Sequence, residues 1–159
     1  MLSILQSKRR AFSLIELVIV VVIIGIIAAI AIPRMSRGAT GANDSALSGN
    51  LAVLRKAIDL YQAEHDGTYP AVATFVAQIT TYTDSAGAAV ATKDATHIFG
   101  PYLRVVPPLS VGTTRKGQSG VAAADAATIG WLYNAADGTI KANTTNAEVD
   151  AKGNQYNLY

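Results

Sequence analysis

The chain has 159 residues, of which 50% are hydrophobic and only 15% are charged. This composition is too apolar for a disordered chain, and the length suits one modest globular domain with an additional segment. Because the sequence contains no cysteine, a disulfide framework, a thiolate zinc site and a cysteine nucleophile are excluded.

The formal net charge of +2 does not indicate nucleic-acid binding, because it depends on the first few residues. Three of the thirteen Lys and Arg residues are Lys8, Arg9 and Arg10. Without residues 1–11, ten cations face eleven anions. The pair Arg115-Lys116 is too small a basic patch for DNA, so no nucleic-acid partner is predicted.

A long apolar segment follows the basic cluster. Residues 17–32 carry no charge over 16 positions, and the 21 residues 12–32 would span roughly 31 Å as a helix. That length is close to the hydrocarbon thickness of a bilayer. The basic residues would hold the amino-terminal end in the cytoplasm, and the chain after Pro33 would lie on the other side.

One acidic residue, Glu16, lies at the start of this apolar segment. A carboxylate costs about 2.5–3.5 kcal/mol at mid-bilayer and less near an interface. Glu16 either lies at headgroup depth and is solvated, or it pairs with a cation. A free α-amino group made by cleavage before Phe12 would be such a cation, and a neighbouring chain could present it more closely than the same chain.

The order of residues 8–16, Lys-Arg-Arg-Ala-Phe-Ser-Leu-Ile-Glu, resembles the signal of type IV prepilins and type II secretion pseudopilins. The resemblance implies that a prepilin peptidase cuts between Ala11 and Phe12, that Phe12 is then N-methylated, and that Glu16 is the carboxylate used in filament assembly. It also implies a helix kink at Pro33. The family usually has Gly before the cut, where this chain has Ala11.

Two other interpretations of the same segment remain open. In an ordinary secretory signal peptide, Ala29-Ile30-Ala31 would be the cleavage site and a soluble protein would begin at Ile32. In an uncleaved signal anchor, the whole segment would remain. The position of Glu16 and the Phe-Ser-Leu-Ile-Glu order favour the prepilin signal.

A second helical pattern follows Pro33. Gly38 and Gly41 weaken the helix, and residues 43–45 (Asn-Asp-Ser) could cap its continuation. One apolar stripe with helical spacing then consists of Leu47, Leu51, Leu54, Ile58 and Tyr61. The helix should end near His65, before Asp66-Gly67. The stripe favours a core role over a partner-binding role.

The remaining chain predicts short elements. A turn at 67–70 leads to a short helix at 71–80, residues 81–97 and 109–127 are expected to be loops, and residues 128–133 and 139–142 are expected to be strands. The tail from Asn143 is polar and is expected to be loosely held. The fold class is α+β, with a long helix packed on a small antiparallel β-sheet, as in pilins. We divide the chain into a leader (1–11), a hydrophobic transmembrane or filament-core helix (12–33), and an amphipathic helix with a periplasmic globular domain (34–159).

Weaker similarities to major pseudopilins occur at residues 60–70, 100–103 and 130–133. Type IV pilins often close a carboxy-terminal loop with a disulfide, which this cysteine-free chain cannot form. Many major pseudopilins bind calcium in an acidic loop. Here the last 30 residues hold only Asp137, Glu148 and Asp150, so we expect no metal site.

No pattern typical of an enzyme is present. His65 and His97 stand 32 residues apart and are expected to be surface histidines. Residues 112–117 contain glycines and cations but lack the Gly-Lys-Ser/Thr ending of a phosphate-binding loop. We therefore predict no catalytic residue and no cofactor.

The resemblance implies a structural subunit of a type II secretion pseudopilus, anchored once in the bacterial inner membrane with its globular domain in the periplasm. Its partners would be the prepilin peptidase, an inner-membrane secretion or pilus assembly platform, membrane lipid before assembly, and further subunits in a homo- or heteropolymeric filament. The alternatives are a type IV pilin for adhesion, motility or DNA uptake, and a membrane-anchored monomeric binding module.

Overall fold

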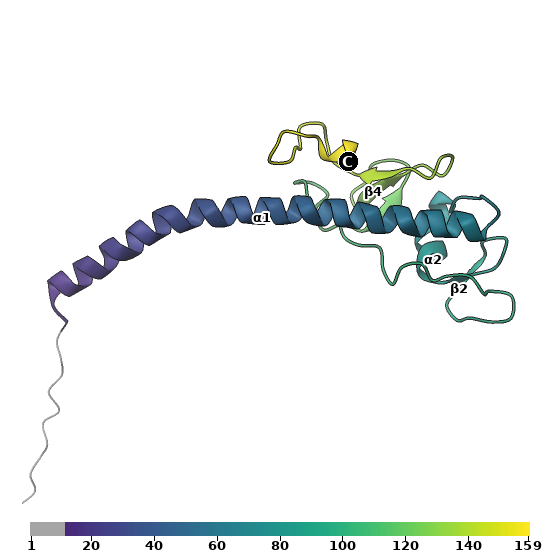
Figure 1. Cartoon of the computed structure of the whole chain (residues 1–159), viewed down its shortest axis with the longest axis horizontal. Coiled ribbons are helices and arrows are strands. Elements are labelled where there is room, and N and C mark those ends of the chain that lie inside the picture. Colours follow the sequence, from purple (N-terminus) through teal and green to yellow (C-terminus); the bar gives the residue numbers. More distant parts are fainter. Residues whose placement is uncertain (1–11) are drawn as a thin grey trace, which may run out of the picture. The chain divides into compact units, whose positions relative to one another are not determined.

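The computed structural model describes residues 12–159, apart from the side chains of residues 32, 33 and 35–37. The elements in chain order are α1 (Leu14–Glu64), η1 (Val72–Thr74), α2 (Phe75–Thr80), β1 (Tyr82–Thr83), β2 (Ala89–Val90), β3 (Gly120–Ala122), β4 (Ile129–Tyr133), β5 (Ile140–Ala142) and η2 (Tyr156–Leu158) (Figure 1). They divide into two compact units, with the boundary between Ala39 and Thr40.

The first unit contains the amino-terminal part of α1. The predicted membrane segment is helical from Leu14 onward, and the backbone stays helical at Pro33. Proline lacks an N–H, so the helix loses one backbone hydrogen bond there. The kink at Pro33 stays a prediction.

The expected helix start at residues 43–45 is wrong, because these residues lie inside α1. The Ser45 hydroxyl donates to the Gly41 carbonyl at 2.9 Å instead of capping a free N–H. Short polar side chains can bond back to the preceding turn in this way, so they do not by themselves mark a helix end.

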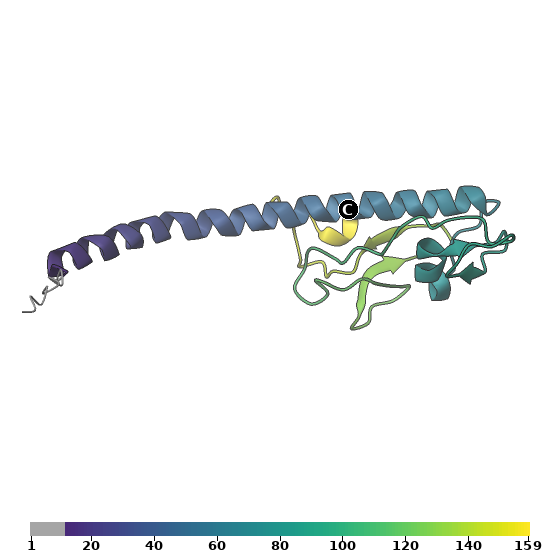
Figure 2. The ribbon, with the colours of Figure 1, turned by 90° about the horizontal axis from the view of Figure 1, so that it is seen from below.

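The second unit is built on the predicted apolar stripe of α1. All five stripe residues are at most 2% exposed. They form one core with residues from α2, the loop before β3 and the three-stranded sheet, including Phe75, Ile79, Leu109, Trp131 and Tyr133. Figure 2 shows α2 and the strands on one side of this part of α1. The core interpretation of the stripe is therefore confirmed.

The helix also ends where the sequence predicts. α1 stops at Glu64, and two residues shortly after it adopt positive φ angles, 52° at Asp66 and 81° at Gly67. The Gly67 N–H donates to the Gln62 carbonyl at 2.9 Å, which satisfies a carbonyl that the helix leaves open.

The three-stranded sheet has the order β3-β4-β5. The predicted strands β4 and β5 pair antiparallel, with Trp131 opposite Ala142 and Tyr133 opposite Ile140. Residues 109–127 are not all loop, because β3 pairs parallel to β4 and makes the sheet mixed. β3 has three residues, Gly-Val-Ala, which are too few and too small to show an alternating pattern. The α+β fold class is confirmed.

The expected loop at 81–97 contains a small antiparallel hairpin, in which β1 pairs with β2. Thr83 of this hairpin is fully buried. Its backbone N–H and carbonyl both pair with Phe99, at 3.1 Å each. The side chain of Asp84 accepts the N–H groups of Ala86 and Ala88 and so holds the turn. These paired backbone groups, not side-chain hydrophobicity, define the hairpin.

The tail from Asn143 is not loosely held. Asn143, Asp150 and Tyr156 are each at most 7% exposed, and residues 156–158 form η2. This segment packs beside β5, so the polar composition of the tail gave a wrong expectation.

Candidate functional site

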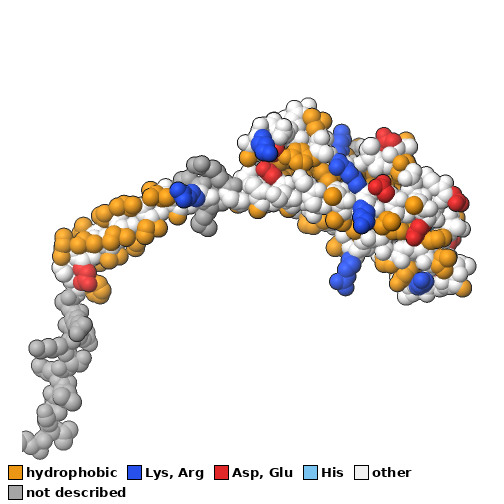
Figure 3. Space-filling view, in the orientation of Figure 1, with side chains coloured by type: hydrophobic (Ala, Val, Ile, Leu, Met, Phe, Trp, Pro, Cys, Tyr) orange, Lys and Arg blue, Asp and Glu red, His pale blue; other side chains and the backbone are white. Residues whose placement is uncertain are grey.

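The first unit presents a continuous apolar helix surface. Leu14–Ala31 has a mean hydropathy of 3.2 over 18 residues, and none of this window is buried inside the described structure. The exposed fraction of the large apolar side chains along it lies between 40% at Val18 and 82% at Leu14. Figure 3 shows these apolar side chains covering the helix surface. By length and composition this helix can cross a membrane, and no other part of residues 12–159 covers it.

The predicted processing and assembly residues lie at the start of this helix. Phe12 is 78% exposed, and the Ser13 carbonyl accepts the backbone N–H groups of Glu16 (3.1 Å) and Leu17 (3.2 Å) as the first turn forms. Ala11, the other side of the expected cut, lies outside the described residues.

Glu16 lies in the first turn of α1, where a negative charge interacts favourably with the helix dipole. Its side chain is exposed, and it has no ion pair within residues 12–159. In the uncut chain the Phe12 nitrogen is a peptide amide, so only cleavage would create an ammonium group there. The geometry leaves the Glu16 carboxylate available to a second chain.

The second unit contains several clusters of polar side chains, the first of which surrounds His65. His65, expected at the surface, is 4% exposed, and its ring stacks on Tyr61 at 3.8 Å. Its Nδ1 lies 2.8 Å from the Tyr61 carbonyl, and its Nε2 lies 2.9 Å from the Asp84 carbonyl. The expectation was wrong because His65 is four residues after Tyr61 and so continues the buried stripe. His65 thus joins the end of α1 to the β1–β2 hairpin.

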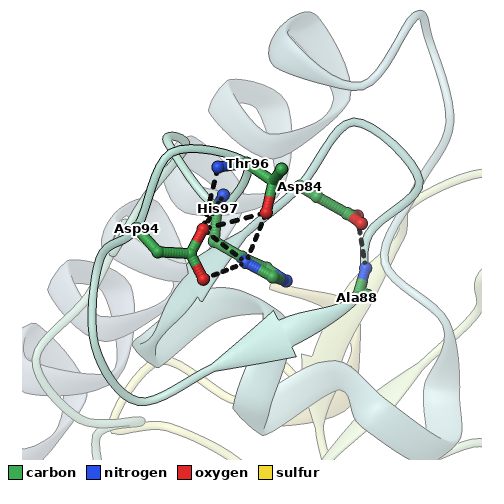
Figure 4. A network of polar contacts seen from close by, with 5 residues as sticks. All are labelled: Asp84, Ala88, Asp94, Thr96 and His97. Carbon is green, nitrogen blue, oxygen red and sulfur yellow. Dashed lines mark hydrogen bonds and ion pairs between the residues drawn. The ribbon is translucent and has the colours of Figure 1, made fainter.

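Figure 4 shows a second cluster, formed by Asp94, Thr96 and His97. The Asp94 carboxylate lies 2.8 Å from the His97 Nδ1 and accepts the backbone N–H of His97 and of Thr96, both at 2.8 Å. The hydrogen bonds from the His97 backbone and ring, followed by those from Thr96, hold the pKa of Asp94 well below its usual range.

This cluster has the residue types of a hydrolase triad but not its geometry. A triad uses one imidazole nitrogen for the carboxylate and the other for the nucleophile. Here the Thr96 hydroxyl also lies at Nδ1, 3.1 Å away, on the same nitrogen as Asp94. The hydroxyl also bonds Asp94 at 2.9 Å, so the three groups brace a loop and do not form a proton relay.

A third cluster fastens the carboxy-terminal segment to α1. The Tyr156 hydroxyl donates to the Asp44 carboxylate at 2.8 Å, and the Tyr159 hydroxyl donates to Asp150 at 2.5 Å. Hydrogen bonds from Tyr159 and Asn154 lower the pKa of Asp150. Burial, reinforced by the bond to Asp44, raises the pKa of Tyr156 to about 12. No sequence pattern predicts these pairs, because they join residues 112 and 9 positions apart.

The acidic side chains near the carboxy terminus are occupied by protein donors. The Asp125 carboxylate accepts two hydrogen bonds from the Arg115 guanidinium group, at 2.7 and 3.0 Å. These bonds and the one from Asn143 lower the pKa of Asp125 to about 2. Burial acts to raise the pKa of Glu148, but bonds from Thr145 and Thr113 outweigh it and lower that pKa. Across the described part of the chain, no three His, Asp or Glu residues gather as metal ligands.

Comparisons with known proteins bear on the first unit. A family model described as the prokaryotic N-terminal methylation motif matches residues 6–32. No curated protein and no solved structure gave a significant match to the chain. The matched segment contains Phe12, Glu16 and the apolar helix up to Ile32.

Proposed function

We propose that this chain, which carries the prepilin signal shared by type IV pilins and pseudopilins, is a structural subunit of a type II secretion pseudopilus. One observation carries the proposal. From Leu14 onward, the methylation motif lies on a helix whose apolar surface is uncovered by the rest of the described chain and whose charged side chain within the candidate span is Glu16.

The apolar surface of this helix explains why the subunit would assemble. Before assembly, lipid covers the side chains of Leu14–Ala31. In a filament, the same side chains of neighbouring subunits would cover one another, and helix packing would replace lipid contacts. The helix therefore has two stable environments, the membrane and the filament core.

Glu16 would favour the filament core over the membrane. At mid-bilayer a carboxylate costs about 2.5–3.5 kcal/mol, whereas a neighbouring ammonium group would neutralise it in a filament. Peptidase cleavage between Ala11 and Phe12 would create that ammonium on Phe12, and N-methylation would keep its charge. Because the pair forms only at one axial offset between two helices, it would also fix the register of the subunits.

The orientation of the chain and its processing partners follow from placing this helix in the membrane. The basic residues before Phe12 would stay in the cytoplasm, and residues 34–159 would enter the periplasm. The subunit would be processed by the prepilin peptidase and extracted by an inner-membrane assembly platform. Two observations favour a pseudopilus over a type IV pilus: the chain has no cysteine for a carboxy-terminal disulfide, and hydrogen bonds of Asp44 and Asp150 hold that segment instead.

Mass spectrometry of the protein extracted from membranes of its host tests the processing. We expect an amino terminus at N-methylated Phe12. A chain beginning at Ile32 would contradict the proposal and indicate a secreted soluble domain, and an intact Met1 would indicate a simple anchor. Deleting the gene then separates the two filament types: a pseudopilin is required for export of secreted proteins, whereas loss of surface pili with unchanged secretion would indicate a type IV pilin.

A further inference from the structure

His65 is a titratable side chain enclosed in the second unit. It is 4% exposed and directly follows Glu64, the last residue of α1. Its ring is stacked on the Tyr61 ring, with 3.8 Å between the centroids and 5° between the planes, and the Phe99 ring lies 5.2 Å away. A ring packed in this way depends on protein groups, and not on bulk water, to satisfy its two nitrogen atoms.

Both of these nitrogen atoms face backbone carbonyl oxygens. Nδ1 lies 2.8 Å from the Tyr61 oxygen, and Nε2 lies 2.9 Å from the Asp84 oxygen. The Asp84 carbonyl also accepts the Gly87 N–H at 3.0 Å, which its second lone pair allows. A carbonyl only accepts hydrogen bonds, so each contact with the ring needs an N–H group. A neutral imidazole has one N–H, and either tautomer would direct a nitrogen lone pair at a carbonyl oxygen, whereas the imidazolium has an N–H for each.

The hydroxyl of Thr83 is a third group beside the ring. Its Oγ1 lies 3.1 Å from Nε2, so it could donate to a neutral Nε2. That arrangement would still leave Nε2 without a proton at 2.9 Å from the Asp84 oxygen. With an imidazolium, the Thr83 hydroxyl keeps its own proton for the Tyr102 hydroxyl, with which it also hydrogen-bonds, and Tyr102 donates to Glu64 at 2.6 Å. The protonated ring is therefore the form in which each of these groups has a partner.

The end of α1 is a favourable place for a positive charge. The last carbonyls of a helix carry the negative end of its dipole, and the last turn of α1 holds no Lys or Arg that would compensate it. Residues 59–103, which form the end of α1, α2 and the β1–β2 hairpin, contain five acidic residues and one lysine, Lys93. Lys93 makes no ion pair within residues 12–159. The flat face of the Tyr61 ring adds an attraction for a stacked cation.

The other titratable groups around the ring do not oppose this charge. Burial raises the pKa of Tyr61 and of Tyr102, so both phenols stay neutral at physiological pH. Asp94 and His97, in the loop after the hairpin, pair with each other (Figure 4). α2 carries no charged side chain. The remaining charged groups near the ring are carboxylates, those of Glu64, Asp66 and Asp84. A buried cation is tolerated when it is hydrogen-bonded, as both N–H groups of this ring would be.

We propose that His65 is a pH-sensitive link, whose imidazolium joins the end of α1 to the β1–β2 hairpin and whose loss of a proton releases the hairpin. Histidine in an unfolded chain gives up its proton at about pH 6.5. Above that pH the folded unit holds one proton more than the unfolded chain. The ratio of folded to unfolded unit therefore falls as pH rises, by up to about tenfold for each pH unit. The inference concerns a single subunit and goes beyond the proposed function.

Nitrogen NMR of the full-length chain in detergent micelles, with isotope-labelled histidine, tests the protonation directly. The two nitrogens of an imidazolium resonate close together, whereas those of a neutral ring are widely separated. We expect the imidazolium pattern for His65 at about pH 7.5, above the ordinary value for histidine. His97→Gln is the matched control, because it leaves His65 as the one histidine of the chain and so assigns its signals. A neutral His65 ring at this pH would overturn the proposal.

Unfolding in urea, followed by the fluorescence of Trp131, measures the consequence for stability. His65→Gln keeps an N–H donor but takes up no proton in this pH range. We expect the folded-to-unfolded ratio of the parent, divided by that of His65→Gln, to fall about fivefold or more between about pH 6 and pH 8. A quotient that stays constant or grows over this range would contradict the proposal.

Hydrogen exchange in the parent shows whether the hairpin is the part that opens. The backbone N–H groups of Thr83 and Phe99 each donate to the other residue's carbonyl at 3.1 Å, so their protection reports the closed hairpin. We expect this protection, corrected for the intrinsic pH dependence of exchange, to fall between about pH 6 and pH 8. Protection that does not depend on pH would overturn the release of the hairpin. This measurement and the NMR spectrum use the parent chain, so they decide the proposal even if His65→Gln does not fold.

Discussion

Leu54 and Val53 are neighbours on α1 with opposite environments. Leu54 is fully buried in the core of the second unit, and Val53 is 48% exposed. Truncating either to Ala changes one side chain on the same turn of the same helix. The pair therefore tests whether the stripe is a packed core face or a free amphipathic surface.

The expected effects differ several-fold. Leu54→Ala removes three buried carbon groups, worth about 2.5 kcal/mol in transfer free energy at roughly 0.8 kcal/mol each, and a cavity adds to this. We expect a loss of about 3 kcal/mol in the free energy of unfolding, within the usual range for such changes. Val53→Ala loses partly solvated groups and gains about 0.5 kcal/mol of helix propensity, so its net effect should be near zero.

The assay uses the one tryptophan of the chain. Trp131 is fully buried in the same core, so unfolding exposes its ring to water and shifts its fluorescence. With the full-length protein in detergent micelles, about 3 kcal/mol corresponds to a fall in Tm of roughly 12 °C for a unit of this size. Val53→Ala should stay within about 2 °C of the parent. Equal and small changes in Tm for both variants would refute the core packing and would favour a partner-binding role for this helix.

The other predictions concern processing, assembly and pH. Glu16→Ala or Glu16→Leu should block filament assembly and leave membrane insertion intact; filament yield equal to the parent, with the full machinery present, would count against the pairing of Glu16 with Phe12. Ala11→Gly should be cleaved at least as efficiently as the parent, and a clear fall in the mature fraction on immunoblots would mean that the cut lies elsewhere. Asp150, whose folded pKa is lowered, contributes stability above its unfolded pKa of about 3.9, and this is lost as pH falls through the folded value. Asp150→Asn should therefore be less stable than the parent at pH 7, and the difference should shrink below about pH 4; a difference independent of pH would contradict this role.

Elements with side-chain periodicity could be predicted from the sequence. The stripe from Leu47 to Tyr61 repeats with helical spacing because one face of α1 is buried, and each residue of it lies in the core. Asp66-Gly67 could be recognised as a stop because both residues adopt positive φ, which Asp tolerates and Gly favours. The methylation motif could be recognised because its residues are contiguous.

Elements defined by backbone pairing could not be predicted in this way. The hairpin of β1 and β2 has two residues per strand, and a pattern of two cannot alternate detectably. β3 depends on a partner strand that follows it along the chain. Gly120 of β3 lies against the backbone just before that strand, because a Cβ on Gly120 would come within 2.4 Å of the Thr128 carbonyl oxygen. Glycine there permits the strands to approach, but in the sequence it indicates a loop.

The carboxy-terminal segment shows why polarity alone misleads. Its Asp and Asn residues look solvated in the sequence, yet Asp150 accepts the N–H groups of Lys152 and Asn154 and the hydroxyl of Tyr159. A buried carboxylate is tolerated when donors surround it, and removal of one donor leaves the charge short of a partner. Because these donors come from the segment itself, it folds around Asp150 as one piece.

The same segment also contacts α1, through hydrogen bonds of Asp44 and Arg55. Asp44 accepts the Tyr156 hydroxyl at 2.8 Å, and Tyr156 also lines a hollow beside Asn43 of α1, together with Val111. A loosened carboxy-terminal segment would therefore lose one wall of that hollow together with its attachment to the helix. Tyr156→Ala should consequently lower the free energy of unfolding, measured by the Trp131 fluorescence, because it removes both a buried ring and the bond to Asp44. Lys116→Glu should leave that free energy nearly unchanged, because Lys116 is exposed and forms no ion pair within residues 12–159.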